Sequence, residues 1–268
     1  MDIRLGRVFV VDNRGGAEGV LGTELAAKAP LDGYNVLVAN LGTFSMTPNL
    51  RKVSYDPLRD FAPITQTIAS ATVLTVSPTL AVHTLKDFVE LAKSKAGRLN
   101  YAAGSNATAL PMDMLRQIAG FNITAVPYKG SAPSVLAVVS SEVSALFGGA
   151  IITVPHVKGE RLRALALAGD RRTQALPDIP TIAESGYPGY ESNSWNGIAA
   201  PAGIPRVIIK KLNLAIVKVL RTAEVKQYMV NDGADPAPSA PDDFAVFLRA
   251  DHAKWARVIR VAGLRDSL

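Results

Sequence analysis

Four short segments of the sequence gather Ser, Thr, Asn, Gly and Lys residues directly after an apolar run. They are residues 40–45, 104–108, 128–133 and 192–197. Hydroxyl, amide and ammonium groups donate hydrogen bonds, and small residues leave the backbone N–H groups open to a ligand. This set of donors suits the binding of an anion such as a carboxylate.

The clearest of these segments is residues 104–108, with the sequence GSNAT. We expect Thr108 or a neighbour to cap a helix that Pro111 helps to start. The first N–H groups of a helix lack carbonyl partners within it, so several backbone N–H groups of this segment could face an anion. Plain capping, which contributes ~1 kcal/mol and needs no ligand, explains the segment equally well.

The segment 128–133 repeats this design. Ser131 is the expected cap, Pro133 falls in the first turn, and Lys129 and Tyr128 lie at the loop before it. Lys129 adds a positive charge that would favour an anion. A solvated or salt-bridged position on the surface is nevertheless the more common role of a single lysine.

The other two segments allow two interpretations each. Thr43 and Ser45 could donate hydrogen bonds to a ligand or simply close a turn. Trp195 stands among small polar residues and could form a ligand wall or pack in the core.

Motifs for catalysis or for binding a metal or cofactor are missing from the sequence. There is no cysteine, and His83, His156 and His252 have neither the spacing nor the neighbours of a zinc site. The common motifs of serine nucleophiles are absent as well. Residues 15–19, GGAEG, lack the spacing of a dinucleotide loop and fit a tight turn between a strand and a helix better. We therefore expect binding without turnover, with no cofactor and no metal.

Charge and hydropathy narrow the class of protein further. The net charge of +6 comes from 29 basic and 23 acidic residues that are scattered along the chain, which argues against a surface for nucleic acid. A mild positive balance is compatible with an anionic ligand or with an ordinary solvated surface. No apolar run reaches the roughly 18 residues of a membrane helix, and residues 1–7 lack the apolar core of a signal peptide. As written, the chain is expected in the cytoplasm.

Apolar runs and helical patterns alternate along the chain, which predicts an α/β fold with a parallel sheet and ligand loops at the carboxyl ends of its strands. Strands are expected at residues 8–11, 36–39, 73–76, 99–102, 143–147 and 162–168. Helices are expected at residues 17–29, 85–95, 112–119, 134–139, 206–220 and 241–261. A long irregular stretch, 171–194, lies between them.

No linker or repeat divides the chain, so two interwoven lobes are expected, with crossings near residues 73–77 and 198–201. Lobe 1 would comprise residues 1–75 together with 199–268, and lobe 2 residues 76–198.

A set of short motifs in consistent order from about residue 5 to residue 263 resembles the Bug or TctC family, the extracytoplasmic receptors of tripartite tricarboxylate transporters. The motifs are VVDNR at 10–14, DGY at 32–34, YDP at 55–57, DFAP at 60–63, LNYA at 99–102, VPYKG at 126–130, LRALA at 162–166, LPDIPT at 176–181, GYE at 189–191 and APAG at 200–203.

The resemblance implies a type II periplasmic-binding-protein fold, in which two α/β lobes joined by a hinge close on a ligand in the cleft between them. Its ligands are small carboxylates: dicarboxylates, tricarboxylates, acidic amino acids, nicotinate or aromatic acids. By motif, Thr43 belongs to a ligand loop of lobe 1 and Trp195 lies near the cleft. The ligand loops of lobe 2 would contribute Asn106, Ala107, Thr108, Lys129, Gly130 and Ser131. The implied protein is a periplasmic monomer whose partners are the carboxylate and the membrane subunits of the transporter.

Three departures from the family pattern carry expectations of their own. Pro111 stands near a position that is usually histidine, and Gly148 and Gly149 replace a polar pair, so we expect a ligand without an amine group. The strand, ligand loop and helix that open the family pattern are missing, so lobe 1 is expected to be incomplete. The alternatives are a sensor or effector-binding domain of the same fold and a truncated, non-functional paralogue.

Overall fold

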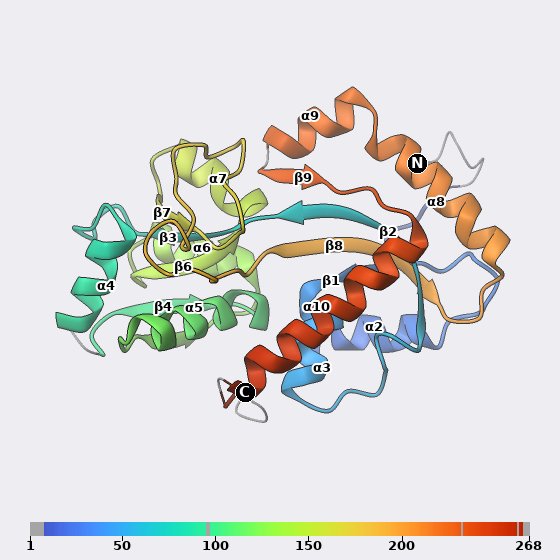
Figure 1. The fold of residues 1–268 in the computed structure, drawn as a ribbon, viewed down its shortest axis with the longest axis horizontal. Coiled ribbons are helices and arrows are strands. Elements are labelled where there is room, and N and C mark those ends of the chain that lie inside the picture. The colour runs from blue at the N-terminus through green and yellow to red at the C-terminus, as the bar shows by residue number, and fades with distance from the viewer. Residues whose placement is uncertain (1–7, 95–96, 232, 262, 265–268) are drawn as a thin grey trace. The chain divides into compact units, whose positions relative to one another are not determined.

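The computed structural model describes residues 8–94, 97–231, 233–261 and 263–264. The chain forms two compact units (Figure 1). Unit 1 comprises Met1–Ala69, Trp195–Tyr228 and Pro236–Leu268, and unit 2 comprises Ser70–Ser194 and Met229–Asp235. Each unit has its own sheet with helices packed on it, so the α/β class expected from the sequence is present in both.

The unit boundaries lie near the predicted crossings but do not coincide with them. The chain passes from unit 1 to unit 2 after Ala69 and returns after Ser194, and a short third segment, Met229–Asp235, also joins unit 2. Strand β3 (Thr72–Val76) is buried along its whole length and pairs with two strands of unit 2. For this reason it belongs entirely to unit 2, whereas we had placed its first residues in lobe 1.

Unit 2 is built on a five-stranded sheet of order β5-β4-β6-β3-β7. Besides β3, its strands are β4 (Asn100–Ala103), β5 (Thr124–Pro127), β6 (Ala145–Gly149) and β7 (Arg163–Leu167). β4 runs parallel to β5 and β6, but β3 runs antiparallel to β6 and β7. The prediction of a parallel sheet was therefore wrong for β3. No crossover helix leads into β3, because this strand follows β2 (Phe61–Ser70) almost directly. Only a crossover connection between two strands imposes the parallel direction.

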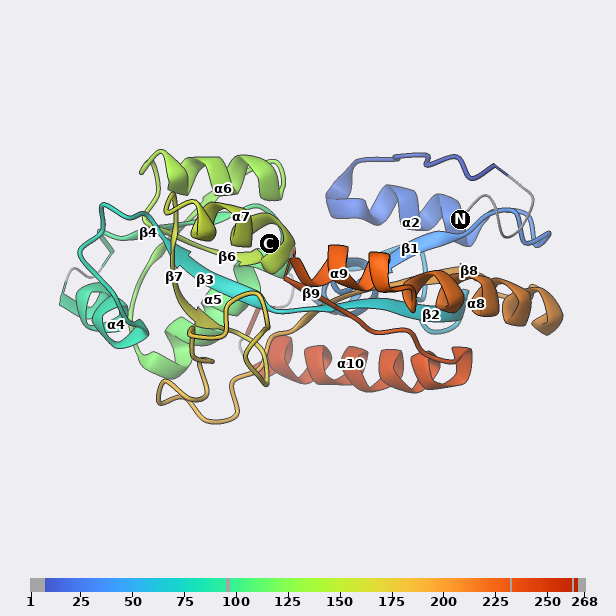
Figure 2. The same cartoon turned by 90° about the horizontal axis from the view of Figure 1, so that it is seen from above.

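Helices cover both faces of this sheet (Figure 2). Leu74 and Val76 of β3 pack in one core with α4 (Leu85–Ser94) and α5 (Asn106–Ala119). Val73, directly before Leu74, faces a second core with α7 (Ala150–Lys158), and α6 (Ser131–Val139) packs in a third. Successive side chains of a strand point to opposite faces, so the cores on the two faces of the sheet explain why every residue of β3 is buried.

The second sheet has four strands in the order β1-β8-β2-β9 and lies mostly in unit 1. Its other strands are β1 (Leu37–Asn40), which runs antiparallel to β8 (Ser194–Pro201), and β9 (Ala234–Pro236). The helical segments are η1 (Ala17–Gly19), α2 (Val20–Ala27), η2 (Gly42–Met46), α3 (Thr47–Leu50), α8 (Arg206–Leu220), α9 (Ala223–Asn231) and α10 (Pro241–Val261). Figure 2 shows α2 and α10 on opposite faces of this sheet.

An aromatic cluster fills the core of unit 1. The ring of Trp195 from β8 meets Phe44 of η2 edge-on at 6.2 Å, and it meets Phe244 and Phe247 of α10 at 5.7 and 5.6 Å. Edge-to-face pairs at these distances are a favourable packing of aromatic rings. The cluster joins η2, β8 and α10 into one packed layer.

The helices predicted at residues 206–220 and 241–261 are confirmed, but three other predictions were wrong. Residues 8–11 are not a buried strand: Val8, Val10 and Val11 are 78, 85 and 81% exposed, and the described part of the chain offers them no strand to pair with. The helix expected from residue 17 is interrupted where Glu18 and Gly19 have positive φ angles of 59° and 91°. α5 begins at Asn106, well before the predicted residue 112, because Pro111 lies within the helix instead of starting it.

Candidate functional site

The predicted ligand loops of unit 2 meet at one edge of its sheet. β4 and β5 are parallel neighbours whose last residues, Ala103 and Pro127, are paired in register. Beyond them Tyr128 donates a backbone hydrogen bond to the carbonyl of Ala103 at 3.0 Å. The chain then enters α5 after β4 and α6 after β5, so the N-termini of both helices lie at the carboxyl ends of these strands.

The two loops pack so tightly that a side chain at Gly104 would not fit. A Cβ atom built there would lie 2.5 Å from the carbonyl oxygen of Gly130 and 2.4 Å from Oγ of Ser134. Ser134 in turn donates a hydrogen bond to the same Gly130 carbonyl at 2.9 Å. The structure therefore brings together the segments around residues 104–108 and 128–131, which we had derived separately.

The N-terminal cap of α5 is Ser105, which lies in the segment where the sequence predicted Thr108 or a neighbour as the cap. Thr108 occupies the third helical position, where its Oγ1 accepts hydrogen bonds from the N–H groups of Gly104 and Ser105 at 3.1 and 3.0 Å. The same hydroxyl donates to the Ser105 carbonyl at 2.9 Å. Its side chain thus holds the loop in shape, and Asn106, Ala107 and Thr108 form the first turn of the helix.

The cap of α6 is Gly130, and Ser131 is the first residue of the helix, which corrects the expected role of Ser131 as the cap. Gly130 has φ 99° and ψ −179°, a conformation that glycine adopts without the steric cost of a side chain. Lys129 is exposed beside this turn. Tyr128 turns away from it, with its hydroxyl donating to Oε1 of Glu142 at 2.8 Å.

A third helix N-terminus at this edge was missed in the sequence. β6 is parallel to β4, and α7 begins at Ala150, directly after β6 ends. Its cap is Gly149, which has no side chain and therefore shows no capping signal. A side chain would not fit at the preceding Gly148, since its Cβ would lie 2.4 Å from Cγ2 of Thr153.

This edge of unit 2 is electrostatically suited to an anion. The N-terminus of each α-helix carries roughly half a positive charge and several N–H groups without partners in the helix. Three such termini lie at the ends of three neighbouring parallel strands, with the cation of Lys129 in one of the loops. The segments 104–108, 128–131 and 148–150 contain no Asp or Glu that would repel a carboxylate.

In unit 1, Thr43 lies in the η2 turn that follows β1. Its side chain is 2% exposed, and its Oγ1 has no hydrogen-bond partner among the described residues. A buried hydroxyl without a partner costs about 1–3 kcal/mol, so such a group is usually satisfied by water or by a ligand. The backbone N–H of Thr43 donates to Oδ1 of Asn40 at 3.1 Å.

Trp195 is 2% exposed and belongs to the aromatic core of unit 1. Its indole Nε1 donates to Oδ2 of Asp251 at 2.9 Å. This environment favours packing, one of the two interpretations left open by the sequence, and its role beside a ligand stays a prediction.

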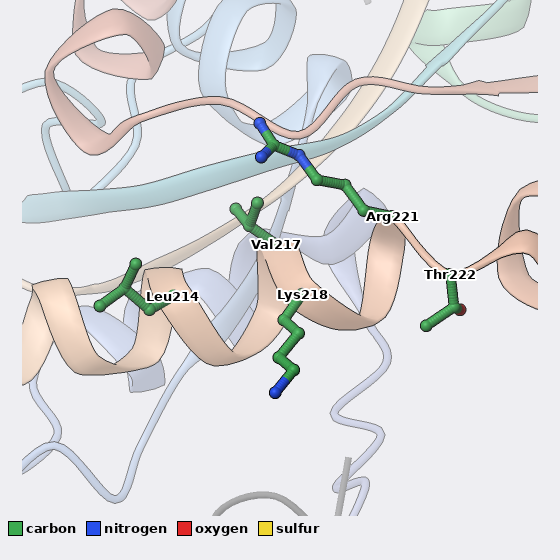
Figure 3. Close-up of a pocket in the computed structure, with 5 residues that line it drawn as sticks. All are labelled: Leu214, Val217, Lys218, Arg221 and Thr222. Atoms are coloured by element: carbon green, nitrogen blue, oxygen red, sulfur yellow. The ribbon is translucent and has the colours of Figure 1, made fainter.

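A pocket of about 580 Å³ lies along α8 and contains none of the predicted site residues. It is lined by Leu214, Val217, Lys218, Arg221 and Thr222, and Figure 3 shows the side chains of Lys218 and Arg221 pointing in different directions. Nothing there gathers polar groups around one point. Within the described ranges there is also no group of three acidic or histidine residues suited to a metal, and no helix long and apolar enough to cross a membrane.

The α/β fold, with loops rich in donors at strand ends, is that of a solute-binding protein of the periplasmic type, and solved structures agree. "R. palustris Rpa4515 with adipate" is 30% identical with a TM-score of 0.93, and the match covers 98% of this chain and 89% of that one. "MatC (Rpa3494) from Rhodopseudomonas palustris with bound malate" is 27% identical with a TM-score of 0.89, over 96% of this chain and 90% of that one.

The family model described as "Tripartite tricarboxylate transporter family receptor" matches residues 1–264. The protein BugT of Bordetella pertussis is 31% identical over 269 residues, which cover 97% of this chain and 81% of BugT. The chain therefore belongs to the TctC family of periplasmic solute-binding proteins, and the resemblance noted in the sequence is confirmed.

Proposed function

We propose that this protein captures a small dicarboxylate and delivers it to the membrane subunits of a tripartite tricarboxylate transporter. The observation that carries the proposal is the close packing of the loops after β4 and β5, which places the N-termini of α5 and α6 at one edge of unit 2. Backbone N–H groups at helix N-termini bind carboxylates well. Two similar solved structures hold dicarboxylates, adipate in one and malate in the other.

Within this proposal, Asn106, Ala107, Gly130 and Ser131 bind a carboxylate through the first turns of α5 and α6. Lys129 adds an attractive charge, and its exposure makes that contribution modest. Thr43 of unit 1 is the further ligand residue, because its buried hydroxyl needs a partner that the described residues do not supply.

The glycines at the end of β6 support a ligand without an amine. An ammonium group needs a carboxylate or several carbonyl acceptors, and Gly148 and Gly149 provide no side chain at that point of the edge. A polar side chain cannot be fitted at Gly148, because Thr153 fills the space. We therefore expect malate or adipate to bind more tightly than aspartate or glutamate.

The test is thermal unfolding of the full chain with malate, adipate, citrate, nicotinate, aspartate and glutamate. A ligand present at 100 times its dissociation constant stabilises the native state by about 2.7 kcal/mol, so the unfolding midpoint should rise by several degrees with malate or adipate. If none of the six acids raises the midpoint, the proposal is wrong. A larger rise with aspartate than with malate would overturn only the expected lack of an amine.

Two lysine variants locate the site. Lys129→Ala should weaken the binding of the dicarboxylate by about 2- to 5-fold, which corresponds to the loss of an exposed charge interaction. Lys158→Ala is the matched control, since Lys158 is exposed in the same unit but at the far end of α7. Equal affinities for the two variants would remove Lys129 from the site.

A further inference from the structure

The η2 turn that carries Thr43 is held by side chains from outside the turn. Three successive carbonyl oxygens, those of Thr43, Phe44 and Ser45, each accept a hydrogen bond from a side chain. The donors are the hydroxyl of Tyr55 at 2.7 Å, Nδ1 of His252 at 2.8 Å and Nδ2 of Asn49 at 2.8 Å. All six residues belong to unit 1, and the three accepting residues are buried.

The turn needs these donors because Pro48 follows it. A proline has no N–H, so residue 48 cannot donate to Phe44 four positions earlier or to Thr43 five positions earlier. The other N–H that could serve the Thr43 carbonyl, that of Thr47, instead donates to Gly42. Tyr55 thus supplies a hydrogen bond that the backbone of this turn cannot make to Thr43, and His252 replaces the one that residue 48 cannot make to Phe44.

The direction of each hydrogen bond follows from its acceptor. A carbonyl oxygen only accepts, so Nδ1 of His252 donates to Phe44, and Nε2 of the same ring lies 3.4 Å from Nδ2 of Asn49. Burial raises the pKa of the Tyr55 hydroxyl, so it remains a donor at neutral pH. Asn49 also donates to the carbonyl of His252 at 3.3 Å, which adds a hydrogen bond between α3 and α10.

We propose that Tyr55, Asn49 and His252, the carbonyl clamp, are positioning residues that hold the Thr43 hydroxyl in the orientation required by the ligand. A π-type turn such as η2 is rare and is often found at functional sites. Here its three clamped carbonyls leave Oγ1 of Thr43 as a buried group without a partner. The clamp rests on the proposed function, because it acts only if Thr43 contacts the bound dicarboxylate.

The experiment measures the dissociation constant of malate or adipate, whichever the wild-type protein binds, together with the unfolding midpoint. Tyr55→Phe and His252→Ala each remove one clamp donor and should weaken binding by about 3- to 10-fold, the range for one lost hydrogen bond. His252→Asn should recover most of that loss, because the Asn amide nitrogen can take the place of Nδ1.

Asn213→Ala is the matched control for a loss of stability alone. Asn213 also bridges backbone carbonyls in unit 1, those of Ile64 and Ser239, at 2.8 Å each, and both of these carbonyls lie outside η2. This variant should lower the unfolding midpoint about as much as the clamp variants while leaving the dissociation constant within about twofold. A loss of affinity in Asn213→Ala equal to that in Tyr55→Phe would overturn the clamp.

A double-mutant cycle decides whether the clamp acts through Thr43. Thr43→Val removes the hydroxyl at nearly constant shape and should weaken binding, and in that background Tyr55→Phe should cause no further loss. Additive losses, or unchanged affinity in Thr43→Val, would show that the clamp does not position Thr43. If the wild-type protein binds none of the acids, the proposed function and the clamp are both wrong. If it binds malate or adipate but the losses are additive, only the clamp is wrong and the proposed function stands.

Discussion

At the scale of single residues, Asp251 is the clearest case of a group whose ionisation affects stability. It lies on α10 and is 8% exposed, and burial raises the pKa of its carboxyl although hydrogen bonds from neighbours such as Trp195 oppose the rise. The folded state therefore holds this proton more tightly than the unfolded chain does. Stability from this group is present below its ordinary pKa of about 3.9 and is lost as the pH rises through the higher pKa of the folded state.

Asp251→Asn should for this reason raise the unfolding midpoint at pH 7 to 8, because it removes a buried charge and keeps an acceptor for the Trp195 indole. The difference from wild type should shrink as the pH falls toward 4, where the wild-type carboxyl takes up its proton. Thermal unfolding across this pH range measures both effects. Asp243→Asn, at an exposed position in the first turn of the same helix, should give no such rise, and a lower midpoint for Asp251→Asn at pH 8 would contradict the argument.

At the scale of elements, the candidate site of unit 2 depends on how closely two strand-to-helix loops approach. Gly104→Ala places a Cβ atom against the Gly130 carbonyl and Ser134, so one loop must move. Overpacking of this kind costs about 1–3 kcal/mol and should lower the unfolding midpoint. The same movement should weaken the binding of malate or adipate, which a titration measures.

Gly149→Ala is the control at the same edge of the sheet. Its Cβ would meet nothing within 4 Å, and its φ of −59° is ordinary for any residue. The unfolding midpoint should therefore stay close to that of the wild type. If Gly104→Ala is equally harmless, the loops have room to separate, and their packing does not define the site.

At the scale of the whole molecule, the distribution of exposed apolar side chains is uneven. Among the residues that the structure describes, more than half of the exposed large hydrophobic side chains lie between Val8 and Val38, including Val10 and Val11 at 85 and 81%. Exposed apolar patches promote association between molecules. Replacing both residues in V10T/V11T should leave the unfolding midpoint nearly unchanged, because neither side chain is packed in the structure.

Light scattering over a range of protein concentrations should then show less association in V10T/V11T than in the wild type. A fall of several degrees in the unfolding midpoint would contradict this prediction, because it would mean that Val10 and Val11 are packed in the folded protein.

Much of the fold was predictable from local signals. The bounds predicted for α8 and α10 match the structure, because their apolar residues recur at helical spacing and two aspartates, Asp242 and Asp243, stand in the first turn of α10. The loops at residues 104–108 and 128–131 were found because small polar residues follow apolar strands. The cap of α5 is Ser105, in the same segment as Thr108, and the cap of α6 is Gly130, directly before the predicted Ser131.

By itself, the sequence determined the α/β class, the family, the absence of cysteine chemistry and the segments that are rich in donors, because each of these depends on residue types and short spacings. Only the tertiary structure decided that β3 runs antiparallel, that Gly104 touches Gly130, that Trp195 is buried against Asp251, and that Tyr55, Asn49 and His252 meet at one turn. His252 lies 208 residues from its acceptor Phe44. No local pattern encodes such a pair, because the contact forms only when α10 packs against η2.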